Sequence, residues 1–299
     1  MHLIIGGAGF IGAAVVRRLV ARGEKVVVAT TRPPRAAATL DGLGVEIRHA
    51  DVRDEASLAA AMAGCTRVVI SIQFPGFPVE DPRRGRTFEE IDRGGTRRVV
   101  DVAERMDVER LVYVSGVNVS PTAPQHWFRT KWASESALRE SAIPWSIIRP
   151  TWVYGPGDKT VSLMVKAARL APFILLPGDG RQRQQPAYLG QVAEAIVAGL
   201  LRDDAAGRIV EVGGADVLTF DALIETIQDV VGRHVPVGHV PIAPLKMLAA
   251  LAAATPWRPI TPDAIEFATM NALADNTVLT DVLGIVPLPF REGLASYLS

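Results

Sequence analysis

The sequence predicts an α/β fold, a doubly wound parallel sheet followed by a smaller and mostly helical C-terminal domain. Three observations support this. Short apolar, mostly β-branched segments alternate with segments of helical periodicity in the first half of the chain. After the turn-forming residues Tyr154–Gly157 the alternation stops and helices dominate. The composition, 48% hydrophobic and 21% charged among 299 residues, is that of a globular chain.

The predicted strands are apolar runs, which suits strands that are buried on both faces of a parallel sheet. They are Leu3–Ile5, Val26–Ala29, Val45–Arg48, Arg67–Ile72, Leu111–Val114 and Trp145–Ile148. The predicted helices between them are Phe10–Arg22, Glu55–Ala63, Phe88–Arg105 and Trp127–Ser141. Strands and helices that alternate in this way imply right-handed βαβ units.

The second half is expected to contain helices and one strand. The helices are Val161–Leu170, Gln191–Leu201, Phe220–Val231, Ala243–Ala253 and Pro262–Leu273. The strand-like segment Arg208–Val212 interrupts them and is a candidate to return to the sheet.

Charge and residue usage exclude several classes of protein. Lys+Arg and Asp+Glu number 32 each, so zero net charge gives no electrostatic case for a nucleic-acid partner. Cys65 is the single cysteine, and the five histidines lack metal-ligand spacing, which excludes a disulfide scaffold and a zinc protein. No apolar stretch reaches the roughly 20 residues of a membrane span. We expect a cytoplasmic protein that is a monomer or homodimer and binds no metal.

A glycine-rich turn connects the first predicted strand to the first helix. Gly6, Gly9 and Gly12 follow one another at a spacing of three, and Phe10 and Ile11 begin the helix. The first glycine permits the tight turn, the second permits close approach of a pyrophosphate, and the third lets the helix pack on the sheet. This arrangement predicts a Rossmann-type dinucleotide site. We expect the NAD(P)-binding domain to span 1–157, with 186–213 returning to it, and a substrate-side cap over 158–299.

The GxxGxxG spacing resembles that of the extended and atypical short-chain dehydrogenase/reductase superfamily. The further matches, in chain order, are Asp51-Val52, Gly95-Thr96 with Asp92 in place of the family's Asn, Tyr113-Val114-Ser115, Lys131 with Glu135, and Arg149–Gly157 (RPTWVYGPG). The chain is also similar to the atypical groups that include an accessory subunit of respiratory complex I and isoflavone-reductase-like proteins. Beyond the glycine turn, the resemblance implies cofactor contacts at Asp51, Val52, Ser71, Ser115, Lys131, Pro150 and Val153.

The end of the second predicted strand favours NADP over NAD. NAD-preferring members carry an acid there, whereas residues 28–35 of this chain contain none. An acid would repel the 2′-phosphate of NADP, while arginine offers a planar fork of donors that matches phosphate oxygens. Arg32 is the predicted phosphate clamp, with Arg35 as a second candidate.

The usual catalytic tyrosine of the superfamily, four residues before Lys131, is replaced by Trp127. Indole has no acid/base pKa near neutrality, so three interpretations remain. Lys131 binds the nicotinamide ribose while His126, or less favourably Tyr154 or Tyr188, handles the proton; or Lys131 itself is the acid; or the protein binds the cofactor without turnover.

The predicted substrate pocket consists of Gln73, Phe74, Trp127 and Tyr154, although packing in the core is the slightly favoured interpretation of Trp127. The segment Gln73–Pro78 contains two Phe and two Pro, which predicts a stiff apolar rim at the carboxyl ends of the strands. We therefore expect an NADP(H)-dependent oxidoreductase that acts on a small apolar carbonyl or enone-like substrate. The alternatives are a non-catalytic NAD(P)H-binding subunit or redox-sensing regulator, and a nucleotide-sugar epimerase or dehydratase.

Overall fold

The computed structural model describes residues 1–77, 79–245, 247, 265–266 and 269–298, and it divides the chain into two compact units. Unit 1 comprises Met1–Pro150, Leu189–Val212 and Ala274–Pro287. Unit 2 comprises Thr151–Tyr188, Gly213–Leu273 and Leu288–Ser299. The segment 274–287 belongs to unit 1, whereas the sequence analysis included it in the cap.

Unit 1 is built on a seven-stranded sheet in which every neighbouring pair is parallel. In spatial order the strands are β3 (Glu46–His49), β2 (Val26–Thr30), β1 (His2–Ile5), β4 (Arg67–Ile70), β5 (Arg110–Val114), β6 (Trp145–Pro150) and β11 (Arg208–Val212). The predicted doubly wound sheet is confirmed, including the return of the strand at 208–212. The strand order reverses between β1 and β4, which is where this architecture binds ligands.

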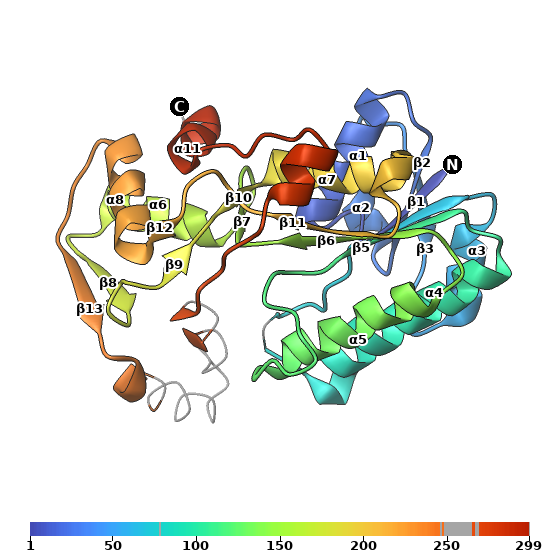
Figure 1. The fold of residues 1–299 in the computed structure, drawn as a ribbon, viewed down its shortest axis with the longest axis horizontal. Coiled ribbons are helices and arrows are strands. Elements are labelled where there is room, and N and C mark those ends of the chain that lie inside the picture. Colours follow the sequence, from blue (N-terminus) through green and yellow to red (C-terminus); the bar gives the residue numbers. More distant parts are fainter. Residues whose placement is uncertain (78, 246, 248–264, 267–268, 299) are drawn as a thin grey trace. The chain divides into compact units, whose positions relative to one another are not determined.

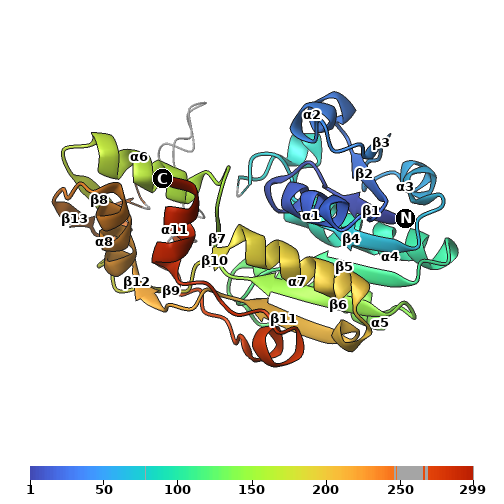
Figure 2. The ribbon, with the colours of Figure 1, turned by 90° about the horizontal axis from the view of Figure 1, so that it is seen from above.

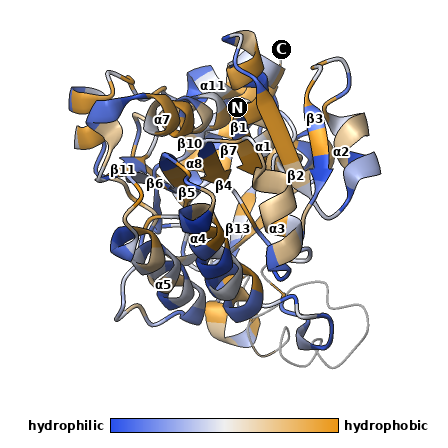
Figure 3. Ribbon diagram, turned by 90° about the vertical axis from the view of Figure 1, so that its right-hand side faces the viewer, coloured by the Kyte–Doolittle hydropathy of each residue, from blue (hydrophilic) through white to orange (hydrophobic). Residues whose placement is uncertain are grey.

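Helices cover both faces of this sheet (Figures 1 and 2). On one face lie α1 (Phe10–Ala21) and α7 (Leu189–Leu201), which contact each other. On the other face lie α3 (Glu55–Met62), α4 (Gly95–Arg105) and α5 (His126–Glu140), which pack side by side in that order. Figure 3 shows the apolar strand β2 in orange and much of α4 in blue. The core between the sheet and α3–α5 is fully buried at positions such as Leu58, Val99 and Leu138.

The predicted helix Phe88–Arg105 is two elements, not one. A π-helical segment, η2 (Phe88–Gly94), precedes α4, and the side chain of Thr87 accepts a hydrogen bond from the Glu90 amide at its start. The sequence reason is the pair Gly94-Gly95. A Cβ on Gly95 would lie 2.6 Å from Val52 Cγ2, so only glycine lets the chain approach this residue closely. Such π-helical turns occur frequently at functional sites.

One α-helix among the described residues of unit 1 was not predicted. It is α2 (Pro33–Thr39), which follows β2 directly, with Arg32 at its N-cap and proline in its first turn. Proline suits the first turn of a helix because its missing N–H has no partner there in any helix. Three alanines then favour helix over loop.

The described residues of unit 2 form helices and three two-stranded sheets. The helices include α6 (Thr160–Leu170), α8 (Phe220–Val231) and α11 (Phe290–Leu298). The sheets pair β7 (Val153–Tyr154) with β10 (Ala187–Tyr188), β9 (Arg183–Gln184) with β12 (Leu218–Thr219), and β8 (Ile174–Pro177) with β13 (Val237–Val240). The predicted helices Ala243–Ala253 and Pro262–Leu273 lie largely outside the described residues.

Candidate functional site

The glycine turn between β1 and α1 is shaped by contacts that exclude side chains. Gly6 has a φ of +81°, and a Cβ there would lie 2.1 Å from the Ser71 carbonyl oxygen at the end of β4. A Cβ on Gly12 would lie 2.3 Å from the Gly6 carbonyl oxygen. Gly6 and Gly12 are therefore required by the fold, because each faces backbone that cannot give way.

Gly9 differs from its two partners. Its backbone is extended, it is exposed, and the only atom near a built Cβ is the Gly6 carbonyl oxygen at 3.1 Å. Gly9 is the N-cap of α1, and no side chain caps this helix or places an acid in its first turn, where Phe10 and Ile11 are half-buried. The first amides of α1 thus point out with the positive end of the helix dipole. This geometry fits the pyrophosphate of a dinucleotide.

Arg32 is exposed immediately after β2, next to the predicted cofactor site. Its backbone amide donates to Thr30 Oγ1 at 3.1 Å, which fixes the turn between β2 and α2. Arg35 is also exposed, on the first turn of α2. The ion pairs among the described residues include neither guanidinium, so both are free to meet an anion from solvent.

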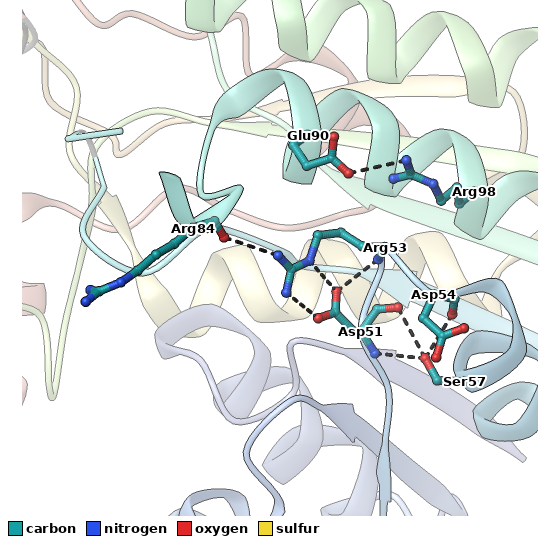
Figure 4. Close-up of polar contacts among 7 residues, drawn as sticks. All are labelled: Asp51, Arg53, Asp54, Ser57, Arg84, Glu90 and Arg98. Carbon is teal, nitrogen blue, oxygen red and sulfur yellow. Dashed lines mark hydrogen bonds and ion pairs between the residues drawn. The ribbon is translucent and has the colours of Figure 1, made fainter. Parts of the chain in front are cut away.

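A polar cluster follows β3, where Asp51 and Val52 were predicted to contact the cofactor (Figure 4). Arg53 donates to Asp51 from Nε (2.9 Å to Oδ1), Nη2 (2.6 Å to Oδ2) and its backbone amide (2.9 Å to Oδ1). These bonds from Arg53 hold the pKa of Asp51 below its usual range. Arg53 Nη1 also donates to the Arg84 carbonyl oxygen at 3.2 Å. One lone pair of Asp51 Oδ2 remains for another donor.

The segment after β4 turns inward. Gln73 is exposed, as predicted for a pocket, but Phe74 is only 2% exposed. Phe74 packs edge-on against Phe88 at 4.8 Å between ring centroids, and Phe77 contacts both rings. Phe74 is therefore packed against other aromatic side chains, and its place at an apolar rim stays a prediction. Pro78 lies outside the described residues.

Trp127 belongs to the same aromatic cluster. It is 5% exposed and contacts Phe88, His126 and Phe128 at ring-centroid distances of 6.2, 5.5 and 5.8 Å. Its indole N–H is buried and has no hydrogen-bond partner among the described residues. This placement agrees with the core interpretation of Trp127 rather than with a pocket wall.

His126 lies at the first residue of α5 and its side chain is 44% exposed. Its Nε2 is 3.6 Å from Glu80 Oε2, and its ring packs edge-on against Phe88 at 5.2 Å. Glu80 in turn accepts the Phe88 amide at 2.7 Å. These contacts account for His126 as a helix-start residue, and none of them involves Lys131.

Lys131 joins a different group, built from three elements. Its Nζ donates to Asp92 Oδ1 at 3.2 Å and to the Tyr113 hydroxyl at 3.4 Å. Asp92 lies on η2 and is 1% exposed, and Tyr113 on β5 is fully buried. Burial disfavours the ammonium, but the oxygens of Tyr113 and Asp92 outweigh burial and raise the pKa of Lys131. Burial raises the pKa of Tyr113, so its phenol stays neutral and Asp92 supplies the opposing charge.

Ser115 follows β5 and makes a second buried network. Its hydroxyl donates to Glu135 Oε1 at 2.6 Å. Glu135 is fully buried and also accepts bonds from Arg149 Nε (2.8 Å), Arg149 Nη2 (2.6 Å) and Arg139 Nη1 (3.0 Å). The Ser115 proton is thus committed to a carboxylate, which makes Ser115 an anchor between β5, α5 and β6. Pro150, the last residue of β6, is buried, and its carbonyl oxygen accepts the Val117 amide.

Val153 and Tyr154 belong to unit 2. Tyr154 is fully buried between Tyr188 and Phe290, and its hydroxyl occupies space that a Cβ on Gly293 would need. The prediction that Tyr154 lines a substrate pocket is therefore not supported, because the side chain has no exposed surface. Burial raises the pKa of Tyr154 further above the neutral range.

Two residues of the Lys131 group were not predicted as site residues, Asp92 and Tyr113. Their sequence signals are visible in retrospect. Tyr113 is two residues before Ser115, and alternation along a strand places both on one face of the sheet. Asp92 departs from the family's amide, and a charge in place of an amide at a buried position requires a partner.

Comparisons with known proteins agree with this geometry. Residues 6–171, more than half of the chain, match a family described as NAD(P)H-binding. The chain is 28% identical over 288 residues to the mitochondrial NADH dehydrogenase (ubiquinone) 1 alpha subcomplex subunit 9 of Arabidopsis thaliana. This alignment covers 93% of this chain and 70% of that protein. It is 33% identical over 181 residues to sterol demethylase protein B of Methylococcus capsulatus, 54% of each.

Solved structures show the same fold. An NADPH-dependent quinone oxidoreductase of Escherichia coli, solved with NADPH, aligns over 100% of both chains with a TM-score of 0.77 and 19% sequence identity. Likeness at this identity establishes the architecture alone. The described residues include no helix that is long and apolar enough to span a bilayer.

Proposed function

We propose that this chain is an NADP(H)-dependent oxidoreductase. It belongs to the NAD(P)H-binding family, within the superfamily of short-chain dehydrogenase/reductases and NAD(P)-dependent epimerases. Its substrate is a small apolar carbonyl or enone-like compound. The observation that carries this proposal is Lys131, a cation held between two side chains in a mostly buried position. A bound nicotinamide would supply the hydride.

Lys131 supplies the proton in this proposal. An ammonium has three N–H donors, of which Asp92 and Tyr113 accept two. The third is left for a ribose hydroxyl or a substrate oxygen, and the side chain keeps 14% exposure through which solvent can return the proton. Transfer from Nζ to the substrate oxygen completes the addition of hydrogen across C=O. Trp127 and Ser115 cannot do this, because indole has no suitable pKa and the serine proton is held by Glu135.

The preference for NADP rests on Arg32. Its guanidinium is exposed beside the end of β2, and no acid stands in that segment to hold it or to repel a phosphate. We expect Arg32→Ala to weaken NADPH about 10- to 150-fold, since hydrogen bonds to a charged group contribute about 1.5–3 kcal/mol. NADH affinity should change little, and Arg35→Ala measures in the same way how much the second candidate contributes to NADPH binding. Calorimetric titration that finds NADH bound as tightly as NADPH by the parent would contradict the assignment.

Turnover is tested by supplying NADPH with a panel of quinones, enones and aldehydes and following the loss of NADPH absorbance. The proposal expects oxidation with at least one class, absent in Lys131→Met. General acid catalysis contributes about 10²–10⁴-fold, which sets the expected loss. Tight NADPH binding with no oxidation of any compound would favour the second candidate instead.

The second candidate is a cofactor-binding module without turnover. One specific observation favours it: Trp127 is buried in an aromatic cluster and Ser115 is bonded to Glu135, so two positions that handle protons in the superfamily are used for packing here. Trp127→Tyr separates the candidates. A gain of NADPH oxidation in this variant would show a site that lacks only its acid.

A further inference from the structure

We propose that Asp92 is the positioning residue of the site: its buried carboxylate fixes the Lys131 ammonium and keeps it charged, so that one N–H is presented outward. This inference rests on the proposed function for its catalytic meaning. Its structural content, the charge and direction of Lys131, can be measured without turnover.

The placement of Asp92 is unusual for a carboxylate. It is 1% exposed, its Oδ1 accepts Lys131 Nζ at 3.2 Å, and its Oδ2 is buried without a hydrogen-bond partner among the described residues. Its backbone carbonyl accepts the Ser134 hydroxyl at 3.0 Å, which ties η2 to α5. A buried carboxylate with one unsatisfied oxygen is costly for stability. A site that needs a cation nearby gives a reason to keep it.

The two acceptors, Asp92 and Tyr113, fix the position and direction of the Lys131 ammonium. Asp92 approaches from η2 and Tyr113 from β5, so Lys131 on α5 is held from two sides. Nζ also lies 5.5 Å from the centre of the Tyr113 ring. If the Lys131 side chain lost its contact with Asp92, it would keep only the neutral Tyr113 hydroxyl as an acceptor. The ammonium would then be free to swing, because lysine has several rotatable bonds.

The charged state of Lys131 follows from the groups that surround Lys131 and Asp92. Asp92 faces Lys131 from η2, and Tyr113 faces it from β5. On α5 itself, Glu135 is neutralised by Arg139 and Arg149. Glu80, from the loop before η2, acts on Asp92 and raises its pKa in the same direction as burial, while Lys131 lowers it. Among the described residues, Asp92 is therefore the only carboxylate that forms an ion pair with Lys131, and no arginine pairs with it. Without it, burial would favour the neutral amine.

The direct test is titration of Lys131 by NMR with ¹³Cε-labelled lysine. The chain has only five lysines, at 25, 131, 159, 166 and 246, so the Lys131 signal is assigned as the one lost in Lys131→Met. In the parent we expect this signal to remain that of an ammonium beyond the ordinary lysine value of about 10.4. In Asp92→Asn, which keeps shape and an acceptor, we expect its midpoint to fall below those of the exposed lysines.

Two further variants keep the test decisive. Asp92→Glu restores the charge and should return the midpoint toward that of the parent. Tyr113→Phe removes the second acceptor without removing a charge, so its shift should be the smaller one. An Asp92→Asn midpoint equal to that of the parent would overturn the inference, as would an equal shift in Tyr113→Phe. Asp92→Asn is nearly isosteric, so we expect it to fold. A native-like spectrum outside this site would show that it has folded.

Turnover provides the second readout. If NADPH oxidation is found, the basic limb of kcat should move to lower pH in Asp92→Asn, with little change in KM for the substrate. Absence of oxidation in the parent would refute the proposed function but not the titration result. Oxidation with an unchanged pH profile and an unchanged Lys131 midpoint in Asp92→Asn would refute the role of Asp92 and leave the proposed function standing.

Discussion

The glycine turn and the Lys131 group lie in the same unit but are constructed in opposite ways. The glycine turn consists of backbone, and its candidate ligand groups are amides at the start of α1. The Lys131 group consists of side chains from η2, β5 and α5, which are distant in sequence. The first follows from local spacing, whereas the second exists only after the sheet and helices have packed.

This difference implies different responses to mutation. A backbone site is disrupted by adding atoms, and the fold tolerates the addition wherever the added atoms point outward. A buried side-chain site is disrupted by removing a partner, and the remaining charge then destabilises the fold. Each of the following predictions tests one side of this contrast.

The largest expected effect on stability is that of Lys131→Met. It leaves the buried Asp92 carboxylate without its cation, and breaking a buried pair in this way costs about 3–5 kcal/mol. Because burial raises the pKa of Asp92, the deficit should shrink as the pH falls and the carboxyl takes up a proton. Urea unfolding at several pH values measures this. Asp92→Asn combined with Lys131→Met should recover part of the loss, and a deficit independent of pH would contradict the buried-pair account.

Gly9→Val is expected to act on binding and not on the fold. The Gly9 backbone is extended and a Cβ there meets only one atom, at 3.1 Å, so the branched side chain would occupy the space proposed for the pyrophosphate. Dinucleotide affinity should fall at least about 100-fold, or about 2.7 kcal/mol, with a native-like melting curve. Gly12→Val is the matched contrast and should lower Tm instead, because its Cβ meets Gly6 backbone at 2.3 Å. Retained affinity in a folded Gly9→Val protein would mean that phosphate binds elsewhere.

The smallest expected effect is that of the Asp51–Arg53 pair. The pKa of Asp51 is depressed by Arg53, so the pair stabilises the fold above the unfolded value of about 3.9, and this stability is lost as the pH falls through the folded value. Both side chains are partly exposed, which limits the contribution to a few tenths up to about 1 kcal/mol. Asp51→Asn should therefore melt slightly below the parent near pH 6, and the gap should narrow as the pH falls below about 3.9. A gap that widens in acid would have the wrong sign.

The same contrast explains what could be predicted from the sequence. Most strands of unit 1 are rich in Val, Ile and Leu, and the spacing of Gly6, Gly9 and Gly12 is local, so both followed from pattern alone. The change from π-helix to α-helix at Gly94-Gly95 did not, because it depends on the packing of Gly95 against Val52. Phe74 and Tyr154 were expected at a pocket, yet partners from other segments bury them.

The residues of the Lys131 group were the hardest to predict for a related reason. Lys131 stood out by its position and by the scarcity of lysine. Asp92 lies 39 residues away from it and Tyr113 lies 18 away. Their meeting depends on the π-helical turn that directs Asp92 toward α5 and on the register that places Tyr113 under the helix. The Gly94-Gly95 pair and the two-residue spacing of Tyr113 and Ser115 can be recognised as signals only once this packing is known.

The structure of this protein in complex with NADPH tests the account most directly. We predict the pyrophosphate against Gly9 and the first amides of α1, the 2′-phosphate on Arg32, and Lys131 Nζ within about 3.2 Å of a hydroxyl of the nicotinamide ribose while still bonded to Asp92. A complex in which Lys131 contacts only Asp92 and Tyr113, and no cofactor atom, would contradict the proposal that this lysine serves the cofactor and the reaction.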